Sequence, residues 1–144
     1  MGETGLALSS VHAPISASLL NGHWGESFST ALSDSTGRQK AVRESEAALH
    51  IAKRIPFDVL VVHLGTPAER SQPGDNNRAS AFKSAEEICR LAEPLGVRVA
   101  LEVIPNDLSS AASLVSMIER DLDSAVAGIC FDFGHVIFMG GRFE

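Results

Sequence analysis

The sequence has few of the features that mark a membrane protein or a secreted one. Its longest apolar stretches, such as Val59–Val62, fall far short of the roughly 18 residues that a membrane-spanning helix needs. The first ten residues have neither the charged start nor the long apolar middle of a secretory signal. We therefore expect a cytoplasmic protein without a membrane partner.

Cysteine is scarce, and basic residues are outnumbered. The two cysteines, Cys89 and Cys130, lie inside apolar patterns without the spacing of a metal site, so we expect small core residues and no disulfide framework. Twelve Lys and Arg residues stand against 18 Asp and Glu residues, and the net charge of −6 is spread along the chain. Because no basic stripe is present to contact phosphates, nucleic acid is a poor candidate for a partner.

What remains is an ordinary globular composition. The chain has 144 residues, of which 44% are hydrophobic and 21% charged. A chain of this length accommodates one domain of roughly 100 to 150 residues. We expect a single domain over residues 1–144.

Short apolar runs alternate with longer segments of helical period, which is typical of a parallel sheet with crossover helices. Strands are predicted at residues 6–12, 57–63, 97–103 and 126–132. In the third strand, the odd-numbered residues from Val97 to Val103 are apolar and share one face, whereas Glu102 lies on the other. The predicted fold class is α/β.

Apolar residues at three- and four-residue steps predict helices that lie on this sheet. The apolar stripes span residues 41–55, 81–95 and 111–122. Gly96 is expected to end the second helix in the left-handed conformation, and Ser109 or Ser110 to cap the start of the third. His50 falls inside the first helix, where we expect a structural role.

Two long segments, residues 15–35 and 66–77, each follow a predicted strand. Both exceed the usual two to six residues of such connections, and loops after strands carry much of the chemistry in this architecture. They are therefore candidate substrate loops. His23 and Trp24, in the first of them, form either a lid over an active site or an exposed loop tip.

Potential metal ligands occur at or near the end of every predicted strand. Carboxyl ends of parallel strands meet at one edge of a sheet, where ionisable groups usually serve catalysis. Carboxylates and imidazoles together suit a divalent cation, which would also relieve the repulsion between two carboxylates. The residues concerned are His12, His63, Glu102, Asp132 and, three positions further, His135.

Each of these residues also has a structural interpretation. Taken alone, His63 is more typical of a core histidine bonded to a backbone carbonyl than of a ligand. Asp132 is equally typical of a cap on the following segment, and His135 is also compatible with a surface turn. His12 precedes Ala-Pro, where the proline fixes the loop whether or not the histidine binds anything. Glu102 is different, because a carboxylate in an otherwise apolar strand is costly without a partner. A functional role is favoured there.

Four strings of the sequence together resemble a known family. They are VHAP at 11–14, LVVHLG at 60–65, LAEPLGVRVALEVIPN at 91–106 and GICFDFGHVIFMGG at 128–141. In order and spacing the chain is similar to the sugar phosphate isomerase/epimerase group of the xylose isomerase-like TIM barrels, which also includes endonuclease IV. The resemblance extends over nearly the whole chain.

The resemblance implies a (β/α)8 barrel that holds a divalent metal such as Mn, Mg, Co or Zn. Glu102 matches the metal-binding glutamate after the fourth strand of that barrel, and Asp132 the aspartate after the fifth. His135 matches a histidine that helps to hold the substrate. In relatives of endonuclease IV, His12, His63 and His135 match additional zinc ligands.

The same resemblance implies that this chain is a fragment. A complete barrel needs roughly 250 residues, and the four strands predicted here correspond to its second through fifth. The later metal-binding His and Glu have no counterpart before Glu144. The alternatives are an incomplete reading frame and a half-barrel that forms a homodimer to cover its open edges.

Three functions follow from these observations. The first is a metal-dependent sugar or sugar phosphate isomerase or epimerase, in which proton transfer passes through an enediolate, with Glu102 and His135 as catalytic residues. The second is an endonuclease IV-like zinc phosphodiesterase acting on abasic DNA, which the acidic charge disfavours. The third is a non-catalytic half-barrel assembly module. For the isolated chain we expect little or no turnover.

Overall fold

A four-stranded parallel sheet organises the part of the chain that the computed structural model describes, residues 5–17 and 25–138. The strands follow one another in the order β1-β2-β3-β4, and each neighbouring pair is parallel. Their bounds are Ser10–His12 for β1, Val59–Val62 for β2, Arg98–Glu102 for β3 and Ala127–Cys130 for β4. The arrangement confirms the α/β prediction of part of a TIM barrel.

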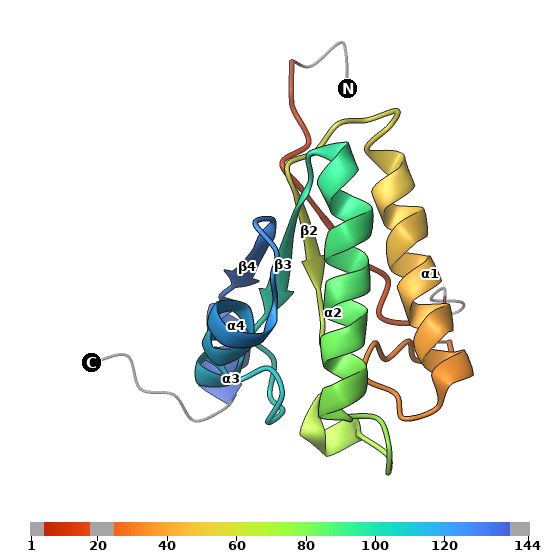
Figure 1. Ribbon diagram of the computed structural model, residues 1–144, viewed down its shortest axis with the longest axis vertical. Coiled ribbons are helices and arrows are strands. Elements are labelled where there is room, and N and C mark those ends of the chain that lie inside the picture. The colour runs from red at the N-terminus through yellow and green to blue at the C-terminus, as the bar shows by residue number, and fades with distance from the viewer. Residues whose placement is uncertain (1–4, 18–24, 139–144) are drawn as a thin grey trace.

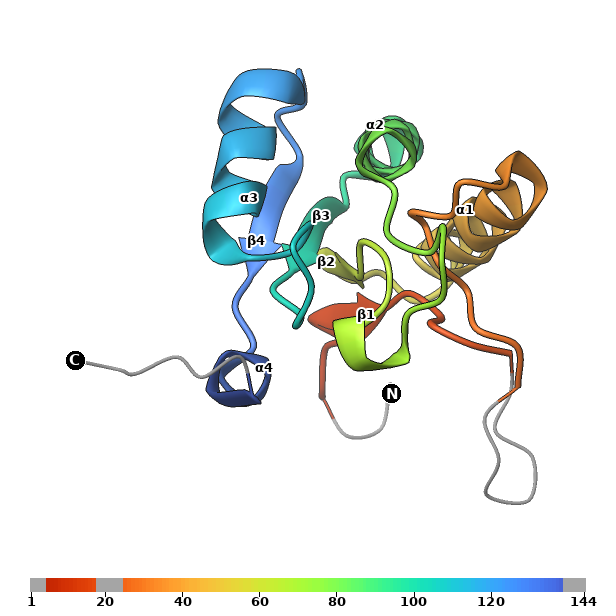
Figure 2. The ribbon, with the colours of Figure 1, turned by 90° about the horizontal axis from the view of Figure 1, so that it is seen from below.

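Helices connect the strands and cover one face of the sheet (Figures 1 and 2). The first three, α1, α2 and α3, lie side by side over that face, whereas α4 lies at the end of β4. Short 3-10 turns at Ala68–Arg70 and Glu93–Leu95 and a π-helical turn at Met117–Asp121 complete the connections. The helices span Ser35–Ile51 (α1), Arg78–Ala92 (α2), Ala111–Ser116 (α3) and Phe133–Phe138 (α4).

Polar side chains mark where the helices begin. Asp34 caps α1, Asn77 caps α2 and Ser110 caps α3, each by accepting a hydrogen bond from a backbone N–H of the first turn. Gly96 adopts the left-handed conformation, with φ of 67°, after the turn that follows α2. The predicted end at Gly96 is confirmed, and of the two candidate serines Ser110 is the cap.

Two predicted elements extend too far. β1 begins at Ser10, which is paired with the first residue of β2, so residues 6–9 lie outside the strand and Leu6 is 71% exposed. α1 ends at Ile51, and Ile55, assigned to the apolar face of that helix, is 43% exposed. Ile55 precedes Pro56, and a residue before proline is disfavoured in helical conformation.

The alternation predicted for the third strand is confirmed by burial. The odd-numbered residues from Val97 to Val103 are at most 1% exposed, because they fill the layer between β3 and the helices. Cys89 of α2 belongs to the same core, as expected, whereas Cys130 of β4 is half-buried. Glu102 lies on the opposite face of β3 from this core, and that face leads to the candidate site.

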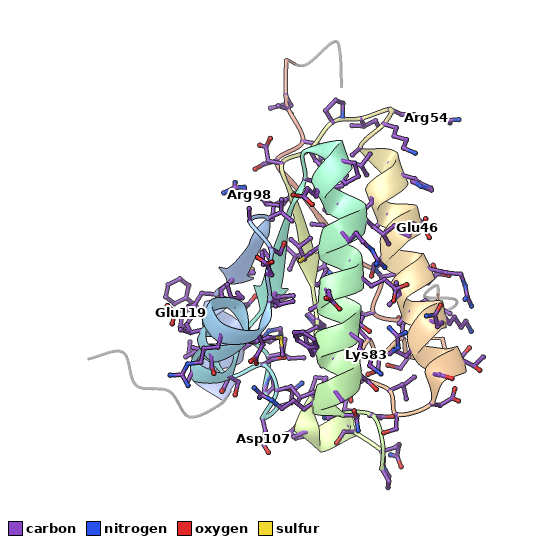
Figure 3. The ribbon with its side chains drawn as sticks, in the orientation of Figure 1. Glu46, Arg54, Lys83, Arg98, Asp107 and Glu119 are labelled. Atoms are coloured by element: carbon purple, nitrogen blue, oxygen red, sulfur yellow. The ribbon has the colours of Figure 1, made fainter. Side chains whose placement is uncertain are left out.

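Charged side chains occupy the surface of the molecule. In Figure 3, Arg54 and Asp107 point outward at opposite ends of the sheet. Among the residues described, none of the helices has the length and apolarity that a bilayer crossing requires.

The same Ile→Ala substitution should affect stability differently in the core and at the surface. Ile88→Ala, at a residue of α2 with no exposed surface, should lower the free energy of unfolding by about 2 to 5 kcal/mol, because it leaves a cavity between α2 and β3. The control Ile55→Ala removes the same atoms at an exposed position and should cost no more than about 0.5 kcal/mol. Urea unfolding followed by circular dichroism measures both. Equal losses would contradict the assignment of Ile88 to the core.

Candidate metal and substrate site

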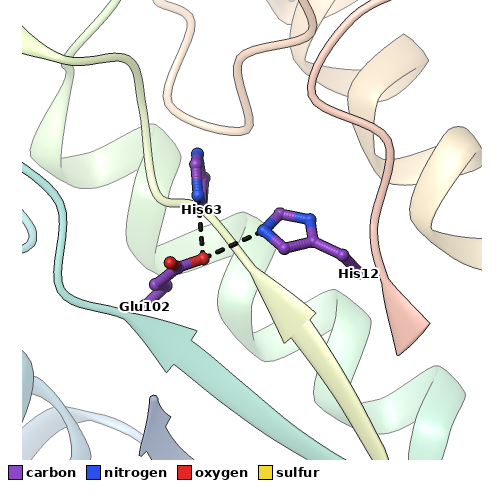
Figure 4. Close-up of side chains that lie close together, drawn as sticks. All are labelled: His12, His63 and Glu102. Carbon is purple, nitrogen blue, oxygen red and sulfur yellow. Dashed lines mark hydrogen bonds and ion pairs between the residues drawn. The ribbon is translucent and has the colours of Figure 1, made fainter. Parts of the chain in front are cut away.

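Three side chains from three neighbouring strands meet at the carboxyl edge of the sheet (Figure 4). His12 ends β1, His63 follows the last residue of β2, and Glu102 ends β3. The Nε2 atoms of His12 and His63 lie 2.9 and 2.8 Å from the same carboxylate oxygen, Oε2 of Glu102. Because the strands are parallel and in register, residues 51 and 39 positions apart in sequence come into contact.

His135 approaches the other oxygen of the same carboxylate. It lies in the first turn of α4, and its Nδ1 atom is 3.3 Å from Oε1 of Glu102. The same Nδ1 is 3.2 Å from the backbone carbonyl of Val103. His135 therefore does not lie in an isolated surface turn; it contacts Glu102. Both oxygens of Glu102 therefore face imidazole nitrogen.

Asp132 lies at the same rim, two residues beyond β4. Its Oδ1 atom accepts a hydrogen bond of 2.9 Å from the backbone N–H of His135, so it caps α4, as one of its two interpretations predicts. It is also near enough for the other interpretation, because ligand atoms of Glu102, Asp132 and His135 lie within 4.8 Å of one another. Ligand atoms of His12, His63 and Glu102 form a second such group. Glu102 is common to both groups.

Glu102 is ionised in this environment. Its side chain is only 6% exposed, and burial by itself raises the pKa of a carboxyl group. Hydrogen bonds from His12 and His63, together with their charge, outweigh that effect and lower the pKa of Glu102 to about 2. The hydrogen bond to Glu102 also raises the pKa of His12, against the opposing effect of burial and with the help of a bond to the Ala13 carbonyl. A buried negative charge thus stands at the centre of the site.

A cavity of about 600 Å³ opens beside these residues, within the range of small-molecule sites. Residues of both long loops line it, as do His63 and His135. Both candidate substrate loops therefore border the site, whereas His23 and Trp24 lie outside the described residues. The loop residues at the cavity wall include Ile15, Ser16, Phe28, Thr66, Pro67, Glu69, Arg70, Gln72 and Asp75.

Several residues of this region were not predicted from the sequence. Arg70 and Phe28 line the cavity, yet neither stands in a motif. Asn76 and Asn106 hydrogen-bond the loop after His63, and only the position of Asn106, just beyond a strand that ends in Glu102, gives a hint of it. His50 belongs to neither ligand group; its Nε2 lies 4.0 Å from Glu46 on α1.

The contact between His12 and Glu102 predicts how the metal-free fold responds to pH. The lowered pKa of Glu102 stabilises the fold above the unfolded value of 4.5, and this is lost as pH falls toward about 2. The raised pKa of His12 stabilises the fold below 6.5, and this is lost as pH rises through the folded-state value. The contribution of the pair is therefore largest between pH 4.5 and 6.5.

Urea unfolding in EDTA at a series of pH values tests this. Compared with the wild type, Glu102→Gln should show a flatter dependence of the unfolding free energy on pH, most visibly on either side of that window. Glu46→Gln, which alters the exposed contact with His50 on α1, should leave the dependence unchanged. Superimposable profiles for Glu102→Gln and the wild type would show that the contact does not form in solution.

Known proteins that are similar to this chain are considerably longer than it is. An uncharacterized protein of Methanocaldococcus jannaschii, MJ1311, is 33% identical over 105 residues, which are 67% of this chain and 34% of the relative. The crystal structure of a D-tagatose 3-epimerase-like protein is 26% identical, with a TM-score of 0.71 over 94% of this chain and 48% of that one. The 3-keto-D-glucoside 4-epimerase YcjR from E. coli is 17% identical, with a TM-score of 0.73 over 98% and 54%.

Two more distant structures of the same fold contain metal. A xylose isomerase-like TIM barrel protein from Mycobacterium smegmatis, solved in complex with magnesium, is 16% identical, with a TM-score of 0.67 over 99% of this chain and 46% of that one. The IOLI protein, solved with a bound zinc atom, is 19% identical, with a TM-score of 0.60 over 95% and 44%.

The chain spans about half the length of these structures and a third of the curated relative. The sequence profile of the xylose isomerase-like TIM barrel family matches residues 1–143. With four parallel strands in sequential order and the match extending over all but the last residue, the chain belongs to the xylose isomerase-like TIM barrel family.

Proposed function

We propose that this chain carries the metal-binding half of a sugar or sugar phosphate isomerase or epimerase. One observation carries the proposal: a buried, ionised Glu102 contacts three imidazoles, and two of these, His63 and His135, line a cavity large enough for a sugar. Buried charge is costly unless it is paired or binds a cation, and such costly groups concentrate at functional sites. The epimerases among the similar structures support the same class of reaction.

The donors present fit a divalent cation. Imidazole nitrogens and carboxylate oxygens are ligands for Zn and Mn, and the carboxylates also suit Mg. We propose Glu102 and Asp132 as the carboxylate ligands, with His12 and His63 as further ligands. When bound, such a cation polarises a carbonyl and so favours loss of a proton from the adjacent carbon. The candidate cations are Mn, Mg, Co and Zn.

The chain's own groups have distinct parts in the proposed reaction. A proton leaves the carbon beside the sugar carbonyl and returns either to the other face of that carbon, which is epimerisation, or to the neighbouring carbon, which is isomerisation. His135, which lines the cavity, is placed to hydrogen-bond a substrate oxygen. Glu102 is the candidate group that accepts this proton and returns it, and its lowered pKa keeps it ionised to hold a cation.

The cavity wall favours a polyhydroxylated ligand. The hydroxyl oxygens of Ser16 and Thr66 are buried without a hydrogen-bond partner among the described residues, and both residues line the cavity. Buried hydroxyls without a protein partner are available to water or to a ligand. The lining also contains the carboxylates of Glu69 and Asp75 and a single arginine, Arg70. Such a lining suits a sugar better than the phosphates of DNA, and we therefore prefer the isomerase or epimerase to the phosphodiesterase alternative.

The matched structures are about twice as long as this chain, so turnover by the 144 residues alone should be low. The candidate metal ligands that this chain contains nevertheless lie close together. We therefore expect this chain by itself to bind the metal but to catalyse the reaction only weakly. A cytoplasmic location, which the short apolar runs predict, is part of the same proposal and is testable by cell fractionation.

Metal binding and proton exchange test the function together. Isothermal titration with MnCl2 should show one site that Glu102→Gln weakens at least 10-fold, since it removes the carboxylate common to both ligand groups. Glu69→Gln, a matched substitution at the cavity wall, should retain the affinity.

Proton exchange tests the chemistry. In D2O with Mn²⁺ and D-tagatose, NMR should show slow incorporation of deuterium beside the carbonyl, and Glu102→Gln should abolish this incorporation. Exchange independent of Glu102 would contradict the proposal.

Self-association is a separate proposal, based on the apolar edge of the sheet. β1 and β4 are the outer strands of the described sheet, and apolar side chains around β4 are exposed. Large exposed apolar patches mark interaction surfaces. We propose that a second copy covers this edge, because two four-stranded halves related by a twofold axis along the barrel supply the eight parallel strands of a closed barrel. The exposed residues are Ile129, Phe131, Phe133 and Ile137.

Sedimentation velocity at micromolar concentration tests this association. The wild type should sediment as a dimer, and Phe131→Glu should shift it to monomer, because a charge at this edge is unfavourable to bury. Ile55→Glu, at a similarly exposed residue beyond α1, should remain dimeric. A monomeric wild type would refute the second copy as the occupant of the edge.

A further inference from the structure

The backbone just after β2 is fastened by side chains instead of by a neighbouring strand. β2 ends at Val62, which is paired with Leu101, and His63 follows beyond the last pair of the ladder. The His63 carbonyl accepts a hydrogen bond of 2.8 Å from the hydroxyl of Thr30. At the point where His63 projects toward Glu102, the sheet itself thus no longer fixes the backbone. Side-chain hydrogen bonds take over that task.

Asn106 is the centre of this fastening. Its Nδ2 donates to the carbonyls of Leu64 and Thr66, at 3.0 and 3.1 Å, and its Oδ1 accepts from the backbone N–H of Ser109 at 2.8 Å. The Ser109 hydroxyl donates to the same Leu64 carbonyl at 3.0 Å. Asn106 is only 5% exposed. One buried amide therefore ties the loop after β3 to the loop after β2.

Asn76 fastens the same segment from the long loop. Its Oδ1 accepts from the backbone N–H of Thr66 at 2.8 Å, and its Nδ2 donates to the Thr66 carbonyl at 3.0 Å. Between the two amides lies Gly65, whose φ of +79° is the left-handed conformation that favours glycine. A Cβ on Gly65 would collide with the side-chain amide of Asn76. The segment after His63 is thus held in one conformation from two sides.

The geometry points to Asn106 as a positioning residue for the site, and we propose that it sets the imidazole of His63 against Glu102. Glu102 ends β3 and Asn106 follows four positions later, and Leu64 directly follows His63. By joining these two loops, Asn106 fixes the separation between the histidine and the carboxylate, which is 2.8 Å from Nε2 to Oε2. Loss of a residue that orients a metal ligand typically lowers metal affinity about 10- to 100-fold. The inference rests on the proposed function for its metal but not for its geometry.

A purely structural role is the competing explanation. Through its Oδ1, Asn106 also closes a turn onto Ser109 just before α3, and loss of that turn would weaken the fold without concerning His63. Asn106→Asp separates the two roles. The aspartate keeps an acceptor for Ser109 but has no N–H to donate to Leu64 and Thr66. Asn77→Asp, at the exposed cap of α2, introduces the same charge and preserves its own acceptor, which makes it the matched control.

Two measurements on folded protein test the inference. Titration with MnCl2 should give a dissociation constant raised at least 10-fold in Asn106→Asp and in Asn106→Ala, and changed less than twofold in Asn77→Asp. In metal-free protein, long-range ¹H–¹⁵N spectra should show the Nε2 resonance of His63 moving in both Asn106 variants and staying in place in the control. The second readout needs no metal, so it judges the positioning role even if the wild type binds none.

Each outcome decides the inference. Unchanged His63 resonances and Mn²⁺ affinity in folded Asn106→Asp would overturn it. Shifted His63 resonances without Mn²⁺ binding by the wild type would support it while refuting the metal in the proposed function. If both Asn106 variants fail to fold, Ser109→Ala, which removes one of the two bonds to the Leu64 carbonyl, takes their place. Its His63 resonance should then move in the same direction, and a fixed resonance would refute the inference.

Discussion

The carboxylate of Glu102 is the constraint around which the described structure is arranged. It is buried at the rim of the sheet, and its two oxygens contact imidazoles from β1, from the segment after β2 and from α4. Burial alone opposes its charge, and the histidines reverse that effect. An ionised carboxylate is thereby retained at the rim of the sheet, beside the cavity that His63 and His135 line. Parallel strand order supplies the convergence, because it brings the carboxyl ends of all four strands to one edge.

The loops extend this arrangement into a cavity, and side-chain amides hold the loops in place. Asn76 and Asn106 satisfy the backbone groups that the end of β2 leaves without a strand partner. Such bonds are costly to omit in a buried segment, and they fix direction as well as stability. The same segment carries His63 on one side and borders the cavity on the other. Stability of the loop and geometry of the site therefore have a common origin.

Periodic features of the chain were predictable, and isolated ones were not. The apolar alternation from Val97 to Val103 predicted both the strand and the opposite face for Glu102, because a strand turns successive side chains to alternate sides. The start of β1 was not predictable, because it is set by pairing of Ser10 with Val59, a residue far along the chain. The extent of α1 was overestimated because the apolar spacing continues to Ile55, just before Pro56, whereas the helix ends at Ile51.

Local periodicity and chain order were enough to predict the β/α order and the apolar stripes of the helices. They also placed a set of potential ligands near strand ends: His12, His63, Glu102, Asp132 and His135. The folded arrangement was needed to show that three imidazoles contact one carboxylate, that Asp132 caps α4 at the same rim, and that Asn106 joins two loops. Those contacts depend on distances between residues far apart in sequence. Strand register and loop conformation set such distances, and no local pattern encodes them.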